Sequence, residues 1–215
     1  MKKVLFVLCL LGNVVSSIFA QEEKTISPFL FEEYKEATIF MGGRKLTGKL
    51  NLYLPTGEFL YIDETDHNKE KILTKPEEVN LIRFGSRVFI PSDEGAVEVL
   101  SSEPLFYVQY KASIRDKGDI VGYGGTSSLS NVKSYSVNST GTAYVSNPMT
   151  LEVGSLYNIY MIGKKQKEIK NMKQLLKYYS KQKDLLEKYI DENGIKFENA
   201  LQMLQLVKYA DSLGK

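Results

Sequence analysis

The sequence has 215 residues but only one cysteine, Cys9, one histidine, His67, and no tryptophan. Because Cys9 lies in an N-terminal apolar stretch, the chain that follows it has no thiol for a disulfide or for cysteine catalysis, and its core must supply the stability. A zinc site normally needs several His or Cys ligands, which this composition does not provide. After the N-terminus, no apolar run approaches the roughly 20 residues that a membrane-spanning helix needs.

The N-terminus has the pattern of a secretory signal peptide. Lys2 and Lys3 precede the eight apolar residues Val4 to Leu11, and the stretch "SSIFA" ends at Ala20. A basic start, a short apolar core and a small residue at its end are typical of an export signal that is removed from the mature protein. We therefore expect a signal peptide over 1–20, cleavage near Ala20, and a mature protein that is periplasmic or secreted.

Charge is unevenly distributed along the rest of the chain. Loss of Lys2 and Lys3 leaves equal numbers of basic and acidic residues, with acidic residues in excess from 21 to 110 and basic residues in excess from 163 to 215. This distribution suggests that the two ends of the mature chain attract each other. A basic stripe can also indicate nucleic-acid binding, but export argues against a nucleic-acid partner.

Residues 21–162 form a predicted β-rich domain. Short segments with alternating or β-branched and aromatic residues, such as "KLNLYL", "EFLYID", "VNLIRF" and "LFYVQYKA", are separated by turn residues including "GG", "PTG" and "PSDEG". This spacing predicts an antiparallel meander. Many segments are apolar on both faces, so we expect a sandwich-like or strongly curved sheet that is covered on each side.

Residues 163–215 form a predicted C-terminal helical segment, which gives the chain an α+β fold class. Ile169, Met172, Leu176 and Tyr179 share a stripe at helical spacing, and a second helix is expected to stop at Asn193-Gly194. A third helix is expected from about Glu198 onward. We expect two or three helices that pack on the sheet.

The helical segment carries a resemblance. The stretch "YYSKQKDLLEKYIDENGIKFENALQMLQLVKYADSL", together with "GKLNLYLPTGEFLYID" and "IRFGSRVFIP", resembles uncharacterised exported proteins of Bacteroidota that combine a β-rich body with a Lys-rich C-terminal helical segment. The resemblance implies location in the cell envelope and this architecture. It brings no catalytic or binding residue with it.

The segment 115–148 interrupts the strand pattern. It is rich in Gly, Ser, Thr and Asn, and it contains Arg115, Tyr123, Tyr135 and Tyr144. Long loops of this kind are usually functional or disordered, and tyrosine suits recognition surfaces. These four residues are the predicted ligand-binding positions, although the tyrosines could instead pin the loop to the sheet.

No catalytic residue is predicted. A Ser-His-acid triad would have to use His67, and no G-x-S-x-G motif presents a serine. The acidic residues around His67 lack the spacing of an EF-hand loop, so neither a metal nor a cofactor is expected. Paired carboxylates of the glycosidase kind remain open, because the fold sets their approach.

The sequence therefore favours a non-catalytic cell-envelope protein that binds a protein or a glycan through the loop 115–148. Two alternatives remain. One is a periplasmic hydrolase that uses two carboxylates in a cleft. The other is a lipocalin-like carrier of a small ligand, which requires a closed barrel with an empty apolar interior.

Overall fold

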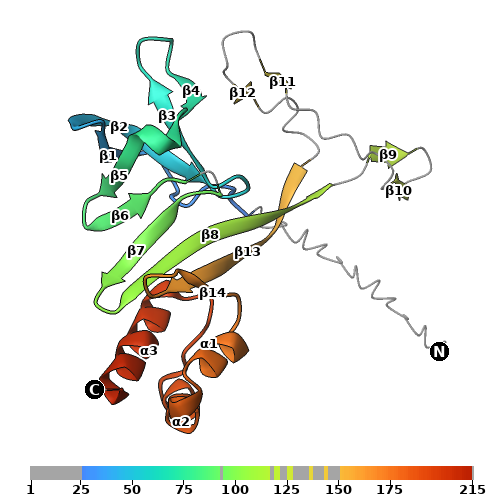
Figure 1. Cartoon of the computed structure of the whole chain (residues 1–215). Coiled ribbons are helices and arrows are strands. Elements are labelled where there is room, and N and C mark those ends of the chain that lie inside the picture. The colour runs from blue at the N-terminus through green and yellow to red at the C-terminus, as the bar shows by residue number, and fades with distance from the viewer. Residues whose placement is uncertain are drawn as a thin grey trace, which may run out of the picture.

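The computed structural model describes residues 26–92, 94–116, 119–121, 125–127, 136–137, 143–144 and 151–214. They form the predicted α+β fold, in which one ten-stranded antiparallel sheet is followed by three C-terminal helices (Figure 1). The sheet strands are β1 (Lys35–Met41), β2 (Arg44–Tyr53), β3 (Glu58–Asp63), β4 (Lys69–Ile72), β5 (Val79–Phe84), β6 (Arg87–Ile90), β7 (Val97–Ser102), β8 (Leu105–Asp116), β13 (Leu151–Ile162) and β14 (Lys167–Ile169).

The order of strands in this sheet is β14-β13-β8-β7-β6-β5-β1-β2-β3-β4, and the sheet is not closed, so β14 and β4 are its end strands. Between β8 and β13 lie four short strands that form two separate hairpins, β9 (Asp119–Val121) with β10 (Gly125–Ser127) and β11 (Ser136–Val137) with β12 (Ala143–Tyr144). The helices are α1 (Met172–Tyr178), α2 (Lys183–Asn193) and α3 (Ala200–Leu213), with short 3-10 turns η1 (Pro76–Glu78) and η2 (Ser180–Gln182). None of the helices in the described part of the chain is long and apolar enough to cross a bilayer.

Strands β1 to β6 curl around a first core, here called the strand core. Gly42 and Gly43 have φ values of 53° and 75°, as a tight hairpin turn between β1 and β2 requires. Four phenylalanine rings at the centre lie with centroids 4.9–6.5 Å apart. The strand core consists of Phe31, Ala37, Ile39, Leu50, Leu52, Leu54, Phe59, Val79, Ile82, Phe84, Phe89, Ala96 and Ala112.

One buried amide attaches the segment before β1 to this core. Asn51, which is 1% exposed, accepts a hydrogen bond from the Phe31 backbone N–H at 3.1 Å and donates to the Phe31 carbonyl at 2.9 Å. Its side-chain oxygen also accepts from the Leu52 backbone N–H at 2.9 Å. A buried polar group is tolerated when its hydrogen bonds are made, and here they fix the Phe31 ring inside the strand core.

The helices cover the other half of the sheet and form a second core, here called the helix core (Figure 1). Asn171 caps α1 by accepting from the Gln174 backbone N–H at 2.9 Å, and Gly194 ends α2 in the left-handed conformation, as its sequence predicts. Ile169, expected on the first helix, instead ends β14, where it pairs with Tyr160 and is buried. The helix core consists of Phe106, Val108, Tyr160, Ile162, Ile169, Leu175, Leu186, Ile195, Met203, Leu206, Val207 and Ala210.

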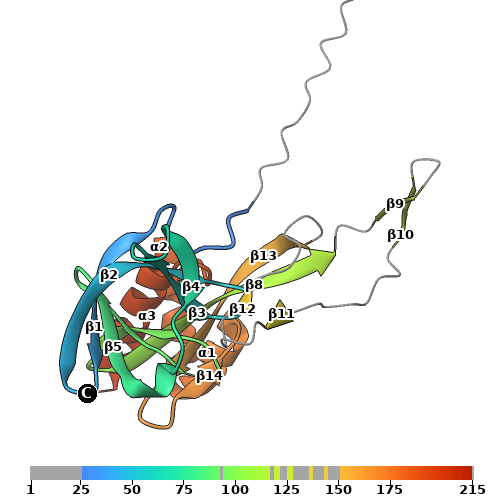
Figure 2. The same cartoon turned by 90° about the horizontal axis from the view of Figure 1, so that it is seen from above.

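Both cores use the same face of β8. Phe106 and Val108 belong to the helix core and Ala112 to the strand core, while Tyr110 between them packs against both. Residues two apart in a strand point to the same side, so the two cores are neighbours along one continuous surface. From above, the far ends of β8 and β13 extend beyond the curled strands and the helices (Figure 2).

A charged cluster lies where the two cores meet. Glu98, which is 5% exposed, receives two hydrogen bonds from the Arg87 guanidinium at 2.7 and 2.8 Å and a third from the Tyr110 hydroxyl at 2.7 Å. The guanidinium also lies over the rings of Phe31, Phe89 and Tyr110, with its central carbon 5.0–5.7 Å from the ring centroids. Burial and the Glu98 charge raise the pKa of Tyr110, so this hydroxyl stays a donor.

Removal of one partner from this cluster is expected to destabilise the fold. In Glu98→Ala the Arg87 guanidinium and the Tyr110 hydroxyl lose their acceptor inside the protein. We expect the free energy of unfolding to fall by about 3 kcal/mol, the lower end of values for broken buried pairs, because Arg87 remains partly exposed. Urea denaturation followed by circular dichroism measures this change. The double variant Arg87→Leu/Glu98→Ala removes both charges. Its loss of stability should be smaller than the summed losses of the single variants Arg87→Leu and Glu98→Ala, and additive losses would contradict the pairing.

Because the Tyr160 hydroxyl is buried, we expect the protein to lose stability at high pH. Tyr160 is fully buried and donates to the Phe197 carbonyl at 2.7 Å, and burial raises its pKa to about 12, above the ordinary value of about 10. The unfolded chain therefore loses this proton first as the pH rises. The contribution of the neutral hydroxyl is complete below pH 10 and lost between about pH 10 and 12, at up to about 1.4 kcal/mol per pH unit.

The matched variant is Tyr160→Phe. It should be less stable by about 1 kcal/mol at pH 8, because the Phe197 carbonyl loses its donor, and its stability should fall less steeply above pH 10. Urea denaturation at a series of pH values measures both slopes. Equal slopes for the two proteins would contradict this assignment.

Candidate functional site

The predicted ligand-binding residues are placed only in part. Arg115 lies in β8, near the end of the strand that extends past both cores. Tyr144 lies in β12, but its side chain, like all of Tyr123 and Tyr135, falls outside the described residues. Binding by the loop 115–148 therefore stays a prediction.

The acidic turn around His67 is an exposed hairpin. His67 and Asn68 both have positive φ, 56° and 55°, and the His67 side chain is 91% exposed. Asp63 and Asp66 bind the Lys71 ammonium at 2.7 and 2.9 Å, and the hydrogen bond from Lys71 holds the pKa of Asp63 well below its usual range. Within the described ranges no three His, Asp or Glu side chains converge in a way that could hold a metal ion. The two aspartates instead stabilise the hairpin through their ion pairs with Lys71.

A hollow lies between the β2–β3 turn, the β4–β5 connection and the β6–β7 connection, where the curled sheet does not close. It has a volume of about 380 Å³, within the range of about 300–1,000 Å³ that is usual for ligand sites. We call it the seam pocket. Its lining residues are Gly57, Glu58, Phe59, Ile72, Leu73, Thr74, Lys75, Pro76, Pro91 and Ser92.

Hydrogen bonds close the seam beside this pocket. The Ala96 backbone N–H donates to the Gly57 carbonyl at 2.8 Å, and the Ala112 N–H donates to the Leu54 carbonyl at 3.3 Å. Gly57 has a φ of 78°, and a Cβ at this position would lie 2.8 Å from the Gly95 Cα. Only glycine allows this approach of the β2–β3 turn to the β6–β7 connection. The "PTG" stretch is thus the predicted turn, and it also forms the closed end of the seam.

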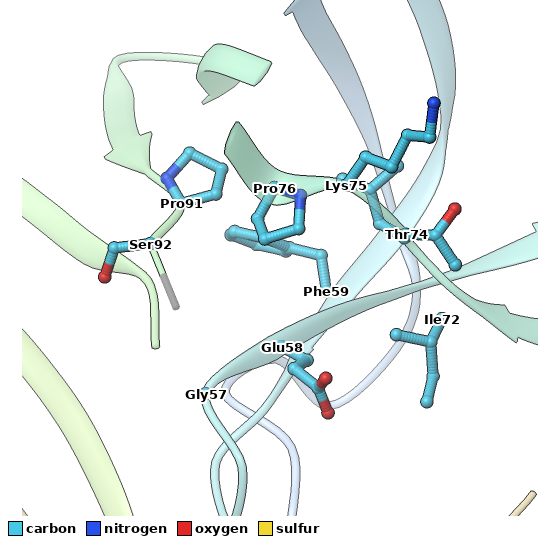
Figure 3. A pocket seen from close by; sticks show the side chains of 10 residues that line it. Gly57, Glu58, Phe59, Ile72, Thr74, Lys75, Pro76, Pro91 and Ser92 are labelled. Carbon is cyan, nitrogen blue, oxygen red and sulfur yellow. The ribbon is translucent and has the colours of Figure 1, made fainter. Parts of the chain in front are cut away.

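Beyond that contact the two sides separate and the pocket opens. The Leu73 N–H still donates to the Phe59 carbonyl at 2.7 Å, which extends the pairing of β3 with β4. Lys75 then turns the chain with a φ of 58°, and Pro76 begins η1, which leads across to β5. Pro91 and Ser92 of the β6–β7 connection face this turn from the other side of the pocket (Figure 3).

The pocket has an apolar interior and a charged rim. Phe59 is 3% exposed and belongs to the strand core, and Ile72, Pro76 and Pro91 add further apolar surface. Figure 3 shows the Lys75 ammonium and the Glu58 carboxylate pointing to opposite sides, away from this interior.

Lys75 is already paired at the rim. Its ammonium binds Glu78 at 2.8 Å, and that carboxylate raises its pKa. This pairing leaves the apolar interior as the part of the pocket that can recognise a ligand.

Sequence reasoning missed this site. Its residues come from "GEF", "ILTKP" and "PS", which belong to a turn with the strand that follows it, a strand end with its turn, and another turn. Pro76 and Pro91 were the sequence feature that could have indicated the pocket, because they place apolar rings in exposed connections. The curl that brings the two prolines to one pocket depends on contacts distant in the sequence, so the pattern alone could not reveal it.

Comparison with known proteins identified no match for this chain among family models, curated proteins or solved structures.

Proposed function

We propose that this protein is an exported, non-catalytic binding module that recognises an extended segment of another protein. An apolar side chain of that segment enters the seam pocket. The observation that carries the proposal is the pocket itself, a hollow of about 380 Å³ that Phe59, Ile72, Pro76 and Pro91 help to line, with the Lys75 and Glu58 charges pointing away from its interior. Concave, mostly apolar sites with few polar groups at their margin are the usual form of ligand sites.

The lining favours a protein segment over a glycan. Phe59 is the single aromatic residue among the ten that line the pocket, and it is 3% exposed. Sugars are usually bound on an exposed aromatic face with several polar groups around it, and this lining offers no such face. A leucine, isoleucine or valine side chain gains from burial against Ile72 and Pro76, at roughly 1.5–3 kcal/mol for a fully buried side chain.

The two alternative functions receive less support from this geometry. Glu58 is the single carboxylate among the lining residues, whereas glycoside hydrolysis uses two carboxyl groups about 5–10 Å apart. The most buried carboxylate described, Glu98, is occupied by Arg87 and Tyr110. A lipocalin-like carrier requires a closed barrel with an empty interior, and here the sheet is open and phenylalanine rings fill its centre.

The test is binding of short peptides by the purified mature chain. A panel of capped heptapeptides that differ only in the central residue, Leu, Ile, Val, Phe or Asn, is titrated while backbone amide NMR signals are followed. We expect peptides with a central aliphatic residue to shift the signals of Gly57, Leu73 and Ser92. The peptide with central Asn should shift them least.

Ile72→Arg places a charge in the pocket and should weaken peptide binding at least about tenfold, or 1.4 kcal/mol. The matched control is Ile90→Arg, on β6, where the side chain is exposed and lies outside the pocket lining. Both variants should keep the circular dichroism spectrum of the parent. Unchanged binding by Ile72→Arg, or binding of oligosaccharides but of no peptide, would contradict the proposal.

A further inference from the structure

The margin of the seam pocket carries a carboxylate that has no partner. Of the ten residues that line the pocket, Glu58 and Lys75 are the two with charged side chains. Glu58 is the first residue of β3 and is exposed. Within the described part of the chain, its carboxylate forms no ion pair and no hydrogen bond. Glu58 therefore presents a free negative charge beside an apolar hollow.

Lys75 does not offset this charge. Its ammonium binds the Glu78 carboxylate at 2.8 Å, and the nearby Glu77 charge adds to the effect of Glu78 in raising the pKa of Lys75. Figure 3 shows Lys75 and Glu58 directed to opposite sides of the pocket. Two carboxylates thus accompany one ammonium on the Lys75 side, and the margin of the pocket is negative on both sides.

The charges at the closed end of the seam balance each other. The Lys111 ammonium donates to the Glu94 backbone carbonyl at 2.9 Å, which brings one basic and one acidic residue together there. Neither residue lines the pocket. Among the described residues, Lys111 forms no ion pair with Glu58, so the negative charge of Glu58 stays uncompensated.

The strand register fixes the spacing between Glu58 and the apolar part of the pocket. Phe59 points into the strand core, so Glu58 and Leu60 on either side of it point to the opposite face of the sheet. Leu60 lies opposite Ile72 in the pairing of β3 with β4, and opposite residues share a face. Glu58 is therefore a diagonal neighbour of Ile72 on one face, a separation of about 7–8 Å.

This spacing matches the repeat of an extended segment. Residues two apart in such a segment point to the same side and lie about 6.8 Å from each other. A segment that places an aliphatic side chain against Ile72 can therefore place the side chain two positions away beside Glu58. A lysine or arginine at that position faces an unpaired carboxylate, whereas an aspartate or glutamate faces a like charge.

We propose that the segment recognised by the seam pocket is basic, with a lysine or arginine two positions from its aliphatic residue that pairs with Glu58. This inference rests on the proposed function and adds a specificity-determining residue outside the apolar interior. Exposed ion pairs contribute modestly to affinity. Glu58 therefore selects among aliphatic segments, while burial of the aliphatic side chain supplies most of the affinity.

Two series of capped heptapeptides test the pairing. All have a central leucine and carry Lys, Gln or Glu at position 2 in one series and at position 6 in the other, with no other charged residue. Dissociation constants are measured at low salt from the backbone amide NMR signals of Gly57 and Ser92. In the series whose variable residue lies beside Glu58, we expect the Lys peptide to bind about fivefold more tightly than the Glu peptide. Added salt should reduce this difference.

Glu58→Gln should remove the difference between the Lys and Glu peptides and leave the affinity for the Gln peptide unchanged, because burial of the leucine is not affected. The matched control is Glu36→Gln on β1, where the glutamate is also exposed and lies outside the lining of the seam pocket. This control removes the same charge elsewhere on the strands and should keep the preference for Lys.

The proposed function and the pairing with Glu58 fail in different ways. If the Gln peptides bind but the Lys peptides bind no more tightly than the Glu peptides in either series, the pairing is overturned and the proposed function stands. The same holds if the preference for Lys persists in Glu58→Gln. If no peptide of either series binds, the proposed function fails and the pairing fails with it.

Discussion

The ion pair between Arg87 and Glu98 is the constraint on which the arrangement of the two cores depends. A carboxylate that is 5% exposed is tolerated only when it is paired, and here one guanidinium and one phenol donate three hydrogen bonds to it. The guanidinium lies over rings of the strand core, whereas Tyr110 packs against both cores. The cluster therefore fixes the curled strands and the helices relative to each other without a disulfide.

The surface proposed for binding results from the same arrangement. Curling of β1–β6 around the phenylalanine rings brings the β2–β3 turn to the β6–β7 connection, where Gly57 lies against Gly95 and accepts a hydrogen bond from Ala96, and the seam opens into a pocket beside this contact. The pocket therefore lies where strands of the curled sheet lack a neighbour.

The sequence predicted those parts of the fold that depend on local chemistry. Alternating apolar residues such as Leu50 and Leu52 indicated the strands, and Asn193-Gly194 indicated the end of α2, where Gly194 adopts a left-handed conformation. Which strands pair with each other could not be predicted from the sequence. Lys167–Ile169 is part of a lysine-rich stretch with helical spacing, yet it forms β14 because β13 offers an edge and Ile169 is buried there. The seam pocket could not be predicted either, because its residues come together only when strands β1–β6 curl around the strand core. For Arg115 and the loop tyrosines the prediction stands untested.

Native-state hydrogen exchange in increasing denaturant tests most directly whether the two cores form one cooperative unit. Amides of Leu50 and Leu52 report on the strand core, and those of Leu206 and Val207 on the helix core. If the buried cluster joins the cores as described, both sets exchange through a single global opening with the same free energy and the same denaturant dependence. Opening of the helix core at a clearly lower free energy, while the strand core stays protected, would contradict the account.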